Sequence, residues 1–213
     1  MVDKFYTPSF NNNKKTVENR KKEFDGLFDF KNQYINHCLF GAVNSGLTDE
    51  VKKWIKAGAN VNYVEFCSYY TPLLNATCIG NYEISKLLIE NGANVNYVNK
   101  VGGTSLSIAA DNGNPEIVKL LLENGASSTI NHKDILRNSP LHKAIRKGSL
   151  ETVKLLVEHG ADLTCSVIVA CTYNHKEKVQ KEIINYLIEK GAEISFVCVF
   201  DVGLNRYLKQ FKK

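Results

Sequence analysis

Thr104-Ser-Leu-Ser-Ile-Ala-Ala110-Asp-Asn-Gly113-Asn-Pro-Glu116-Ile-Val-Lys-Leu-Leu-Leu122-Glu-Asn-Gly125-Ala126 is the stretch that decides the fold. Apolar residues recur at helical spacing on both sides of Gly113, and Gly125 follows the second run. Glycine adopts the left-handed conformation that ends helices, and a proline such as Pro115 suits a first helical turn. The stretch therefore predicts two short helices joined by a tight turn.

The same pattern recurs along the chain. Close copies lie at 71–93 and 139–161, and looser ones at 38–59 and 167–192. The glycine that ends the second helix stands at residues 58, 92, 125, 160 and 191, with spacings of 34, 33, 35 and 31. A period near 33 that occurs five times indicates an array of stacked helix pairs.

The residues at recurring positions have physical tasks. Pro72 and Pro140 each follow a hydroxyl residue that can cap the first turn. Paired leucines in the second helices form an apolar stripe, and each contributes about 1.5–3 kcal/mol when buried. Because a Cβ resists the left-handed conformation, we expect Gly125→Val to destabilise the fold by more than about 1 kcal/mol.

These motifs resemble those of the ankyrin repeat family. The resemblance rests on Thr71-Pro-Leu, on Ser139-Pro-Leu-His142, and on Gly-Ala-Asn-Val-Asn at 58–62 and 92–96. It implies an all-α fold, an ankyrin-repeat α-solenoid in which stacked helix-turn-helix pairs carry projecting β-hairpin loops. It also implies that His142 forms a hydrogen bond with the neighbouring turn.

The resemblance covers about residues 34–195 and suggests three parts. Residues 1–33 are a polar N-terminal segment, partly disordered or forming one capping helix. Residues 196–213 are a C-terminal capping helix with a basic tail. Between them we expect repeats at 34–62, 63–96, 97–130, 131–164 and 165–195, of which the fifth lacks most of its hairpin and is longer between its helices.

The distribution of charge along the chain bears on which partners it can bind. The net charge of +5 divides into +2 for residues 1–35, zero for 36–198 (16 basic and 16 acidic residues) and +3 for 199–213. Neutral repeats argue against nucleic acid as a partner, and a nucleic-acid-associated role through the two basic ends is a remote alternative. The sequence has no apolar run of about 20 residues, so we expect no membrane span.

Further expectations concern location and chemistry. Residues 1–6 lack the apolar stretch of a secretory signal, so we expect a cytoplasmic protein, with delivery into a host cell as the alternative. We also expect the protein to be monomeric. Six cysteines without paired short spacing predict reduced, mainly buried thiols, with a disulfide or metal site as the alternative. The motifs indicate no catalytic residue, no cofactor and no metal.

The resemblance implies recognition by hairpin tips and by the exposed side of the first helices. The aromatic candidates for contacting a partner are Tyr63, Phe66, Tyr69, Tyr70 and Tyr97, because clustered tyrosines are frequent in binding hot spots. The alternative is that Phe66 and Tyr70 only fill the gap between hairpins.

Basic candidates lie on the first helix of the fourth repeat, at Lys143, Arg146 and Lys147, whereas Asp111 and Asn112 hold similar positions in the third repeat. A change of sign along one face would orient an acidic partner segment, and simple solvated charge is the alternative.

Asn62 and Asn96 occupy the position at which the family resemblance implies hydroxylation by an asparaginyl hydroxylase. The alternative for both is a hydrogen-bonded turn residue. The function that we predict is a non-enzymatic scaffold that binds another protein. The chain also resembles the stand-alone, Lys- and Asn-rich ankyrin proteins of intracellular bacteria, large DNA viruses and protists, and this resemblance implies an alternative: an effector that acts inside a host cell through the same surface.

Overall fold

The computed structural model describes residues 31–172 and 177–193. Within these residues the secondary structure is entirely helical. The helices are a segment at 31–44, α2 (Thr48–Lys56), α3 (Pro72–Cys78), α4 (Tyr82–Glu90), α5 (Ser105–Asn112), α6 (Pro115–Glu123), the 3-10 turn η1 (Ala126–Thr129), α7 (Pro140–Lys147), α8 (Leu150–Glu158), α9 (Ser166–Thr172) and α10 (Glu177–Glu189).

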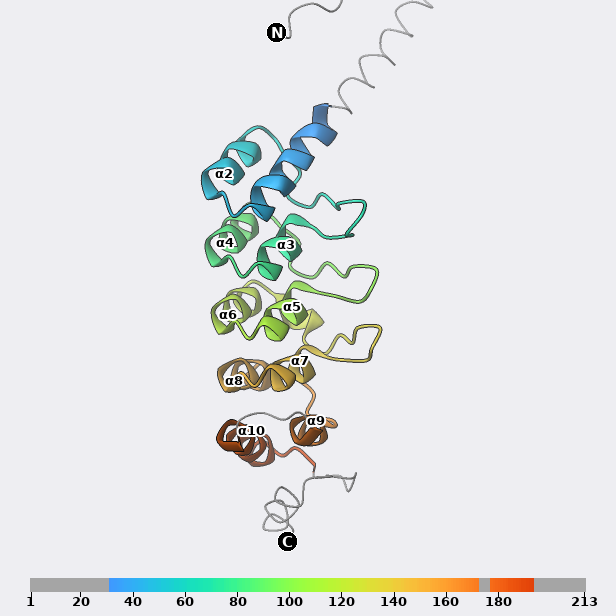
Figure 1. Ribbon diagram of the computed structural model, residues 1–213, viewed down its shortest axis with the longest axis vertical. Coiled ribbons are helices and arrows are strands. Elements are labelled where there is room, and N and C mark those ends of the chain that lie inside the picture. The colour runs from blue at the N-terminus through green and yellow to red at the C-terminus, as the bar shows by residue number, and fades with distance from the viewer. Residues whose placement is uncertain (1–30, 173–176, 194–213) are drawn as a thin grey trace, which may run out of the picture.

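The helices form two parallel columns, as Figure 1 shows. The helix at 31–44 heads one column, in which α3, α5, α7 and α9 contact one another in order. The other column contains α2, α4, α6, α8 and α10, and each helix again packs on the next. This arrangement confirms the predicted all-α solenoid of stacked helix pairs.

Hydroxyl residues begin the first helices, as the sequence predicted. Thr71 Oγ1 accepts a hydrogen bond from the amide of Leu74 at 3.2 Å. The Ser139 hydroxyl accepts from the His142 amide, while the Ser139 amide donates to His142 Nδ1, both at 3.4 Å. This leaves the proton on His142 Nε2, which donates to the carbonyl of Thr164 at 3.2 Å. The predicted hydrogen bond of His142 to the neighbouring turn is therefore present.

Glycines end the second helices in the left-handed conformation. Gly58, Gly92, Gly125, Gly160 and Gly191 all have φ between 86° and 92°. The apolar stripe is buried as predicted, with Leu88, Leu121 and Leu156 at 0% exposure. The small first-helix residues Ala76, Ala109, Ala110 and Ala144 are also fully buried, which lets neighbouring helix pairs approach closely.

Three details differ from the simplest expectation. Residues 31–33 already belong to the first helix, so this helix includes residues before the predicted start at 34. The three projecting loops are turns without an assigned strand in the described residues, and each contains two internal backbone hydrogen bonds. In the fifth unit α9 follows the turn at 162–165 directly, so no loop projects there (Figure 1). The caps predicted within 1–33 and at 196–213 lie outside the described residues, except for 31–33.

The expectation of mainly buried thiols is wrong for the described cysteines. Cys67, Cys78 and Cys165 are exposed, and Cys38 and Cys171 are partly buried. The reason is their position, because Cys67 lies in a projecting loop, Cys78 ends α3 and Cys165 precedes α9. All five are free thiols, and burial raises the pKa of the Cys171 thiol to about 11.

In the part of the chain that the structure describes, no helix has both the length and the apolarity needed to cross a membrane.

Candidate functional site

Three loops project from one side of the first-helix column, at 63–70, 97–103 and 131–138 (Figure 1). We call them together the loop edge. Their tips carry large apolar side chains in contact with solvent: Phe66 is 80% exposed, Val101 53%, Ile135 70% and Leu136 72%. Apolar groups gathered on one exposed edge are a common sign of an interaction surface.

Neighbouring loops of the edge touch one another. The amide of Ile135 donates a hydrogen bond to the carbonyl of Val101 at 3.3 Å. Gly102 lies so close to the third loop that an added Cβ would stand 2.8 Å from Asp134 Cα. The Tyr97 hydroxyl reaches the carbonyl of Tyr69 at 3.4 Å and joins the first loop to the second. The three tips therefore form one contiguous surface.

The first two loops share an aromatic cluster made of Phe66, Tyr69, Tyr97 and Lys100. The ring centroids of Phe66 and Tyr69 are 6.5 Å apart, and Lys100 Nζ lies 3.6 Å from the centroid of the Tyr69 ring. An ammonium group at this distance from a tyrosine is in cation–π contact. The cluster holds Tyr69 and Lys100 in a defined arrangement.

The other two tyrosines of the first loop lie differently. All three tyrosines of the first loop are half-buried, but within the described residues Tyr63 and Tyr70 make no ring contact with Phe66 or Tyr69. Burial raises the pKa of Tyr70, with a smaller effect of the neighbouring Cys78. Tyr70 thus fits the packing alternative, whereas Phe66 is too exposed to fill a gap.

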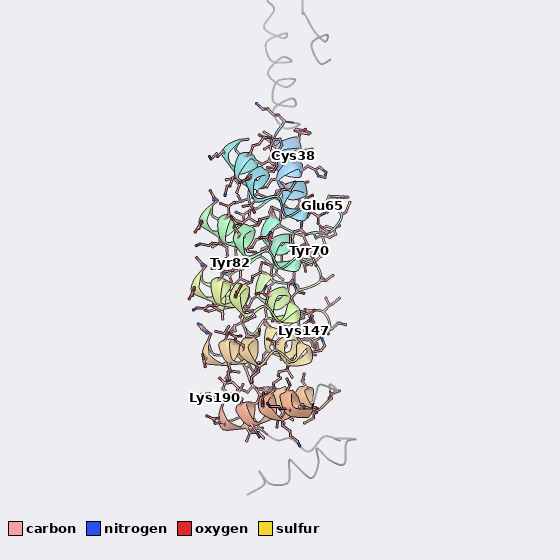
Figure 2. All side chains as sticks on the ribbon, turned by 60° about the vertical axis from the view of Figure 1, so that its left-hand side comes forward. Cys38, Glu65, Tyr70, Tyr82, Lys147 and Lys190 are labelled. Carbon is pink, nitrogen blue, oxygen red and sulfur yellow. The ribbon has the colours of Figure 1, made fainter. Side chains whose placement is uncertain are left out.

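Glu65 organises the first loop (Figure 2). Its carboxylate accepts hydrogen bonds from the Ser68 amide at 2.7 Å, the Ser68 hydroxyl at 2.8 Å and the Cys67 amide at 3.0 Å. These hydrogen bonds, that of the Ser68 amide first, lower the pKa of Glu65 to about 2. The first loop therefore carries a fixed negative charge at neutral pH.

Two of the basic candidates on α7 have acidic partners within the chain. Lys143 Nζ lies 2.9 Å from Asp134, and these side chains are only 12% and 10% exposed. Arg146 pairs with Asp111 of α5, so the opposite charges that suggested an oriented face neutralise each other. Lys147, which is labelled in Figure 2, is exposed, and its stem lies over Gly113.

The carboxyl group of Asp134 also holds the third loop together. It accepts hydrogen bonds from the amides of Leu136 at 2.9 Å and Asn138 at 3.0 Å. Burial alone would raise the pKa of Asp134, but the Asn138 amide and Lys143 outweigh that effect and lower it. Lys143 thus acts on the loop edge through the shape of the third loop.

Asparagines tie successive helix pairs together below the loops. The side-chain amide of Asn62 donates to the Gly92 carbonyl at 3.0 Å, and its oxygen accepts from the Asn94 amide at 2.7 Å. Asn96 donates in the same way to Gly125 at 3.1 Å, but its buried oxygen has no hydrogen-bond partner in the described residues. The amide that would supply one belongs to Ser127, which lies in the 3-10 turn η1. Both residues therefore serve as hydrogen-bonded turn residues.

Two shallow hollows lie away from the loop edge. One, of about 400 Å³, is lined by Tyr82, Leu120 and charged residues of α6. The other, of about 380 Å³, lies between the turn at 162–165 and residues 191–193. Among the described residues, no group of three or more His, Cys, Asp or Glu side chains is placed to hold a metal ion.

Comparison with known families agrees with this architecture. The family described as ankyrin repeats (three copies) matches residues 39–134 and 127–197. The chain belongs to the ankyrin repeat family. Ankyrin repeats are generally protein-interaction modules, and they are typically not enzymes.

Several curated proteins share these ankyrin repeats. Protein FPV031 of fowlpox virus (strain NVSL), named as an ankyrin repeat protein, is 33% identical over 112 residues, which are 52% of this chain and 32% of that protein. The ankyrin repeat protein R664 of Acanthamoeba polyphaga mimivirus is 46% identical over 56 residues, 24% of this chain and 35% of that protein. Human 2-5A-dependent ribonuclease is 37% identical over 75 residues, 35% of this chain and 10% of the ribonuclease.

The chain thus spans about a third or less of the length of these relatives. The part that matches the ribonuclease consists of repeats and covers 10% of that protein.

The structure brings together some of the predicted contact residues and adds others. Phe66, Tyr69 and Tyr97 meet in one cluster, whereas Lys143 and Arg146 are engaged with carboxylates. Sequence reasoning overlooked Val101, Ile135 and Leu136. The sequence contained a signal for these residues, because an apolar residue stands in each of three successive polar loops, at positions 66, 101 and 135. The spacings are 35 and 34 residues, close to the length of one repeat.

Proposed function

We propose that this ankyrin repeat protein is a non-enzymatic scaffold that binds another protein through its loop edge. The observation that carries the proposal is the row of exposed apolar side chains on three successive, touching loops. Burying such side chains against a partner removes apolar surface from water at about 25 cal/mol per Å². The general role of ankyrin repeats as interaction modules supports the same conclusion.

The contact residues have different roles in this proposal. Phe66, Val101, Ile135 and Leu136 supply apolar contact, and Tyr69 and Tyr97 supply aromatic contact. Tyr63 and Tyr70, which make no ring contact with Phe66 or Tyr69 in the described residues, border the surface. The predicted basic residues of α7 extend the surface: Lys147 by direct contact, Arg146 by its partly exposed guanidinium, and Lys143 through its ion pair with the third loop.

The test compares two tagged variants with the wild-type chain. Phe66→Ala combined with Leu136→Ala removes two apolar tips, while Tyr82→Ala removes an aromatic side chain that is 41% exposed on α4, in the other helix column (Figure 2). Quantitative affinity purification with mass spectrometry from the native cell identifies the partners of the wild type. We expect the double variant to lose a partner about 10-fold or more, since central apolar contacts dominate interfaces, and Tyr82→Ala to retain it.

Circular dichroism confirms that both variants are folded. The proposal fails if the double variant retains every partner while Tyr82→Ala loses one, because the outer helix column would then be the binding surface.

A second candidate use is favoured by the viral relatives. Repeats shared with fowlpox virus and mimivirus proteins support a host-directed effector that acts through the same loop edge. We then expect the protein in the host cytoplasm, and immunostaining of infected cells checks this. Staining confined to the producing organism would contradict it.

Asparagine hydroxylation stays a prediction for Asn62 and Asn96. Because Asn62 is exposed and Asn96 is half-buried, we expect the added oxygen, a mass increase of about 16 Da, first on Asn62. Tryptic peptide mass spectrometry of protein produced with and without an asparaginyl hydroxylase checks this order.

A further inference from the structure

We propose that the second and third loops select a partner segment in which acidic side chains flank an apolar residue. This inference rests on the proposed function, since it names the chemistry of the segment that the loop edge binds. It follows from the charges that have no carboxylate within salt-bridge distance at this edge and from the apolar side chains between them.

The basic residues at the tips of these two loops form no ion pair in the described residues. Lys100 and Arg137, together with Lys133, have no carboxylate within 4 Å in the described residues. Lys100 lies over the Tyr69 ring, and Lys133 only faces Asp162 at a longer distance, where its charge helps to lower the pKa of that carboxyl. By contrast, Lys86 and Lys119 on the outer helices each lie 3.9 Å from a glutamate. The second and third loops therefore place three cations without an ion pair beside the exposed apolar tips of the loop edge.

The negative charges near the edge are already committed or lie elsewhere. Asp134 is paired with Lys143 and receives two loop amides, so it does not cancel Arg137. Glu65 lies in the first loop, where three hydrogen bonds hold its carboxylate in the charged form. An acidic segment is thus repelled by the first loop and attracted by the other two, which gives its binding a direction.

Apolar side chains stand between these cations. Val101 is 53% exposed and is joined to the third loop through the Ile135 amide. Ile135 and Leu136 are about as exposed as Phe66 and directly precede Arg137. A segment that places one apolar side chain on Val101, Ile135 and Leu136 can direct flanking carboxylates to Lys100 and Arg137. Arginine suits this task, because its guanidinium binds a carboxylate through two parallel hydrogen bonds.

The backbone at Arg137 supports the assignment. Arg137 has a φ of 62°, in the left-handed region. The second loop has a glycine at the equivalent position, Gly102, with a φ of 75°. A residue with a Cβ adopts this conformation only at a cost in free energy. The chain nevertheless presents a long cationic side chain at this exposed site, and Arg137 has no ion pair within the described residues.

The test uses a random peptide library displayed on phage and selected against the intact 213-residue chain. Enriched peptides are synthesised, and calorimetry measures their affinity for the wild type, for Lys100→Gln combined with Arg137→Gln, and for Ile135→Ser combined with Leu136→Ser. The matched control is Lys119→Gln combined with Lys86→Gln, which changes the net charge equally on the outer helices.

We expect enriched peptides to carry Asp or Glu beside Leu, Ile or Phe. The Lys100→Gln and Arg137→Gln variant should bind them about 10-fold more weakly at physiological salt, and less so at 1 M salt, where charges are screened. The control should change affinity by less than about two-fold.

Other outcomes separate this inference from the proposed function. Two outcomes overturn the inference and leave the proposed function standing. In both, peptide binding depends on Ile135 and Leu136. In the first, the enriched peptides carry no excess of acidic residues; in the second, their affinity is unchanged in the Lys100→Gln and Arg137→Gln variant. If no enriched peptide depends on either pair of loop residues, both fail. A fluorescent single-stranded RNA that binds more tightly than every peptide and is lost in the charge variant also overturns the inference.

Discussion

At the residue scale, single backbone positions decide where each helix pair ends. Gly125 follows α6 with φ of 89°, and an added Cβ there would meet no atom within 4 Å. The requirement for glycine is therefore conformational and not steric. Gly41 offers a contrast, because it lies inside the helix at 31–44, is exposed, and also has open space around a new Cβ.

This contrast predicts opposite effects of the same substitution. We expect Gly125→Ala to lower the free energy of unfolding by about 1–2 kcal/mol, because alanine resists the left-handed conformation. Gly41→Ala should raise it by about 0.5–1 kcal/mol, because alanine loses less backbone entropy in a helix. Urea denaturation followed by circular dichroism measures both changes. Equal effects of the two substitutions would contradict the conformational explanation.

A second residue-scale prediction concerns Glu65 and pH. Its pKa is lowered from the ordinary 4.5 to about 2 in the folded chain, chiefly by the Ser68 amide. Since the folded pKa lies below the unfolded one, the stability that Glu65 contributes is fully present above pH 4.5 and is lost as the pH falls towards 2. Carbon-detected NMR titration of the Glu65 carboxyl should show a midpoint near 2. Ser68→Ala removes one of the three hydrogen bonds and should raise the titration midpoint of Glu65. A midpoint near the ordinary 4.5 in the wild type would contradict the hydrogen bonding of the first loop.

At the element scale, the third loop is joined to α7 by a nearly buried ion pair. Lys143 is 12% exposed and reaches Asp134, whose carboxylate also receives two loop amides. Lys147, one turn later in α7, is exposed. The two lysines look alike in sequence but differ in their surroundings.

We therefore expect Lys143→Met to lower the free energy of unfolding by about 2–3 kcal/mol, because it leaves Asp134 charged and without its cation. Lys147→Met should change it by less than about 0.5 kcal/mol, as is usual for an exposed side chain. Urea denaturation measures both variants. If the two substitutions cost the same, the ion pair does not stabilise the third loop.

At the scale of the whole molecule, the helix pairs of the described residues pack mainly on their neighbours, so stability is a sum of local terms coupled through interfaces. The pair α5 and α6 lies in the middle, with α3 and α4 on one side and α7 and α8 on the other. Leu106 of α5 is fully buried there. The single tryptophan, Trp54, lies in the first pair and reports separately on that end.

Leu106→Ala should cost about 3–4 kcal/mol, through lost burial and the cavity left behind. Because it weakens the middle of the stack, we expect Trp54 fluorescence and total circular dichroism to give different urea midpoints, whereas the wild type gives a single one. Leu39→Ala, at an equally buried site in the first helix, serves as the comparison and should lower the Trp54 midpoint. Coincident midpoints for Leu106→Ala would show that the stack unfolds as one unit.

The sequence by itself determined the repeat, the helix pairs and the family. Those features depend on local physics: Thr71 and Ser139 cap helices, Gly92 and Gly160 end them, and leucines at helical spacing must be buried. It also indicated that the first loop is aromatic, but it could not show that Tyr70 is half-buried while Phe66 points to solvent.

Only the tertiary structure decided which charges remain available. Asp111 and Arg146 are 35 residues apart, and Asp134 and Lys143 lie in different elements, so their pairing depends on how neighbouring repeats stack. The same stacking brings Val101, Ile135 and Leu136 to one edge beside Lys100 and Arg137. Helices follow from local preference, whereas a surface is made by distant residues that stacking places side by side.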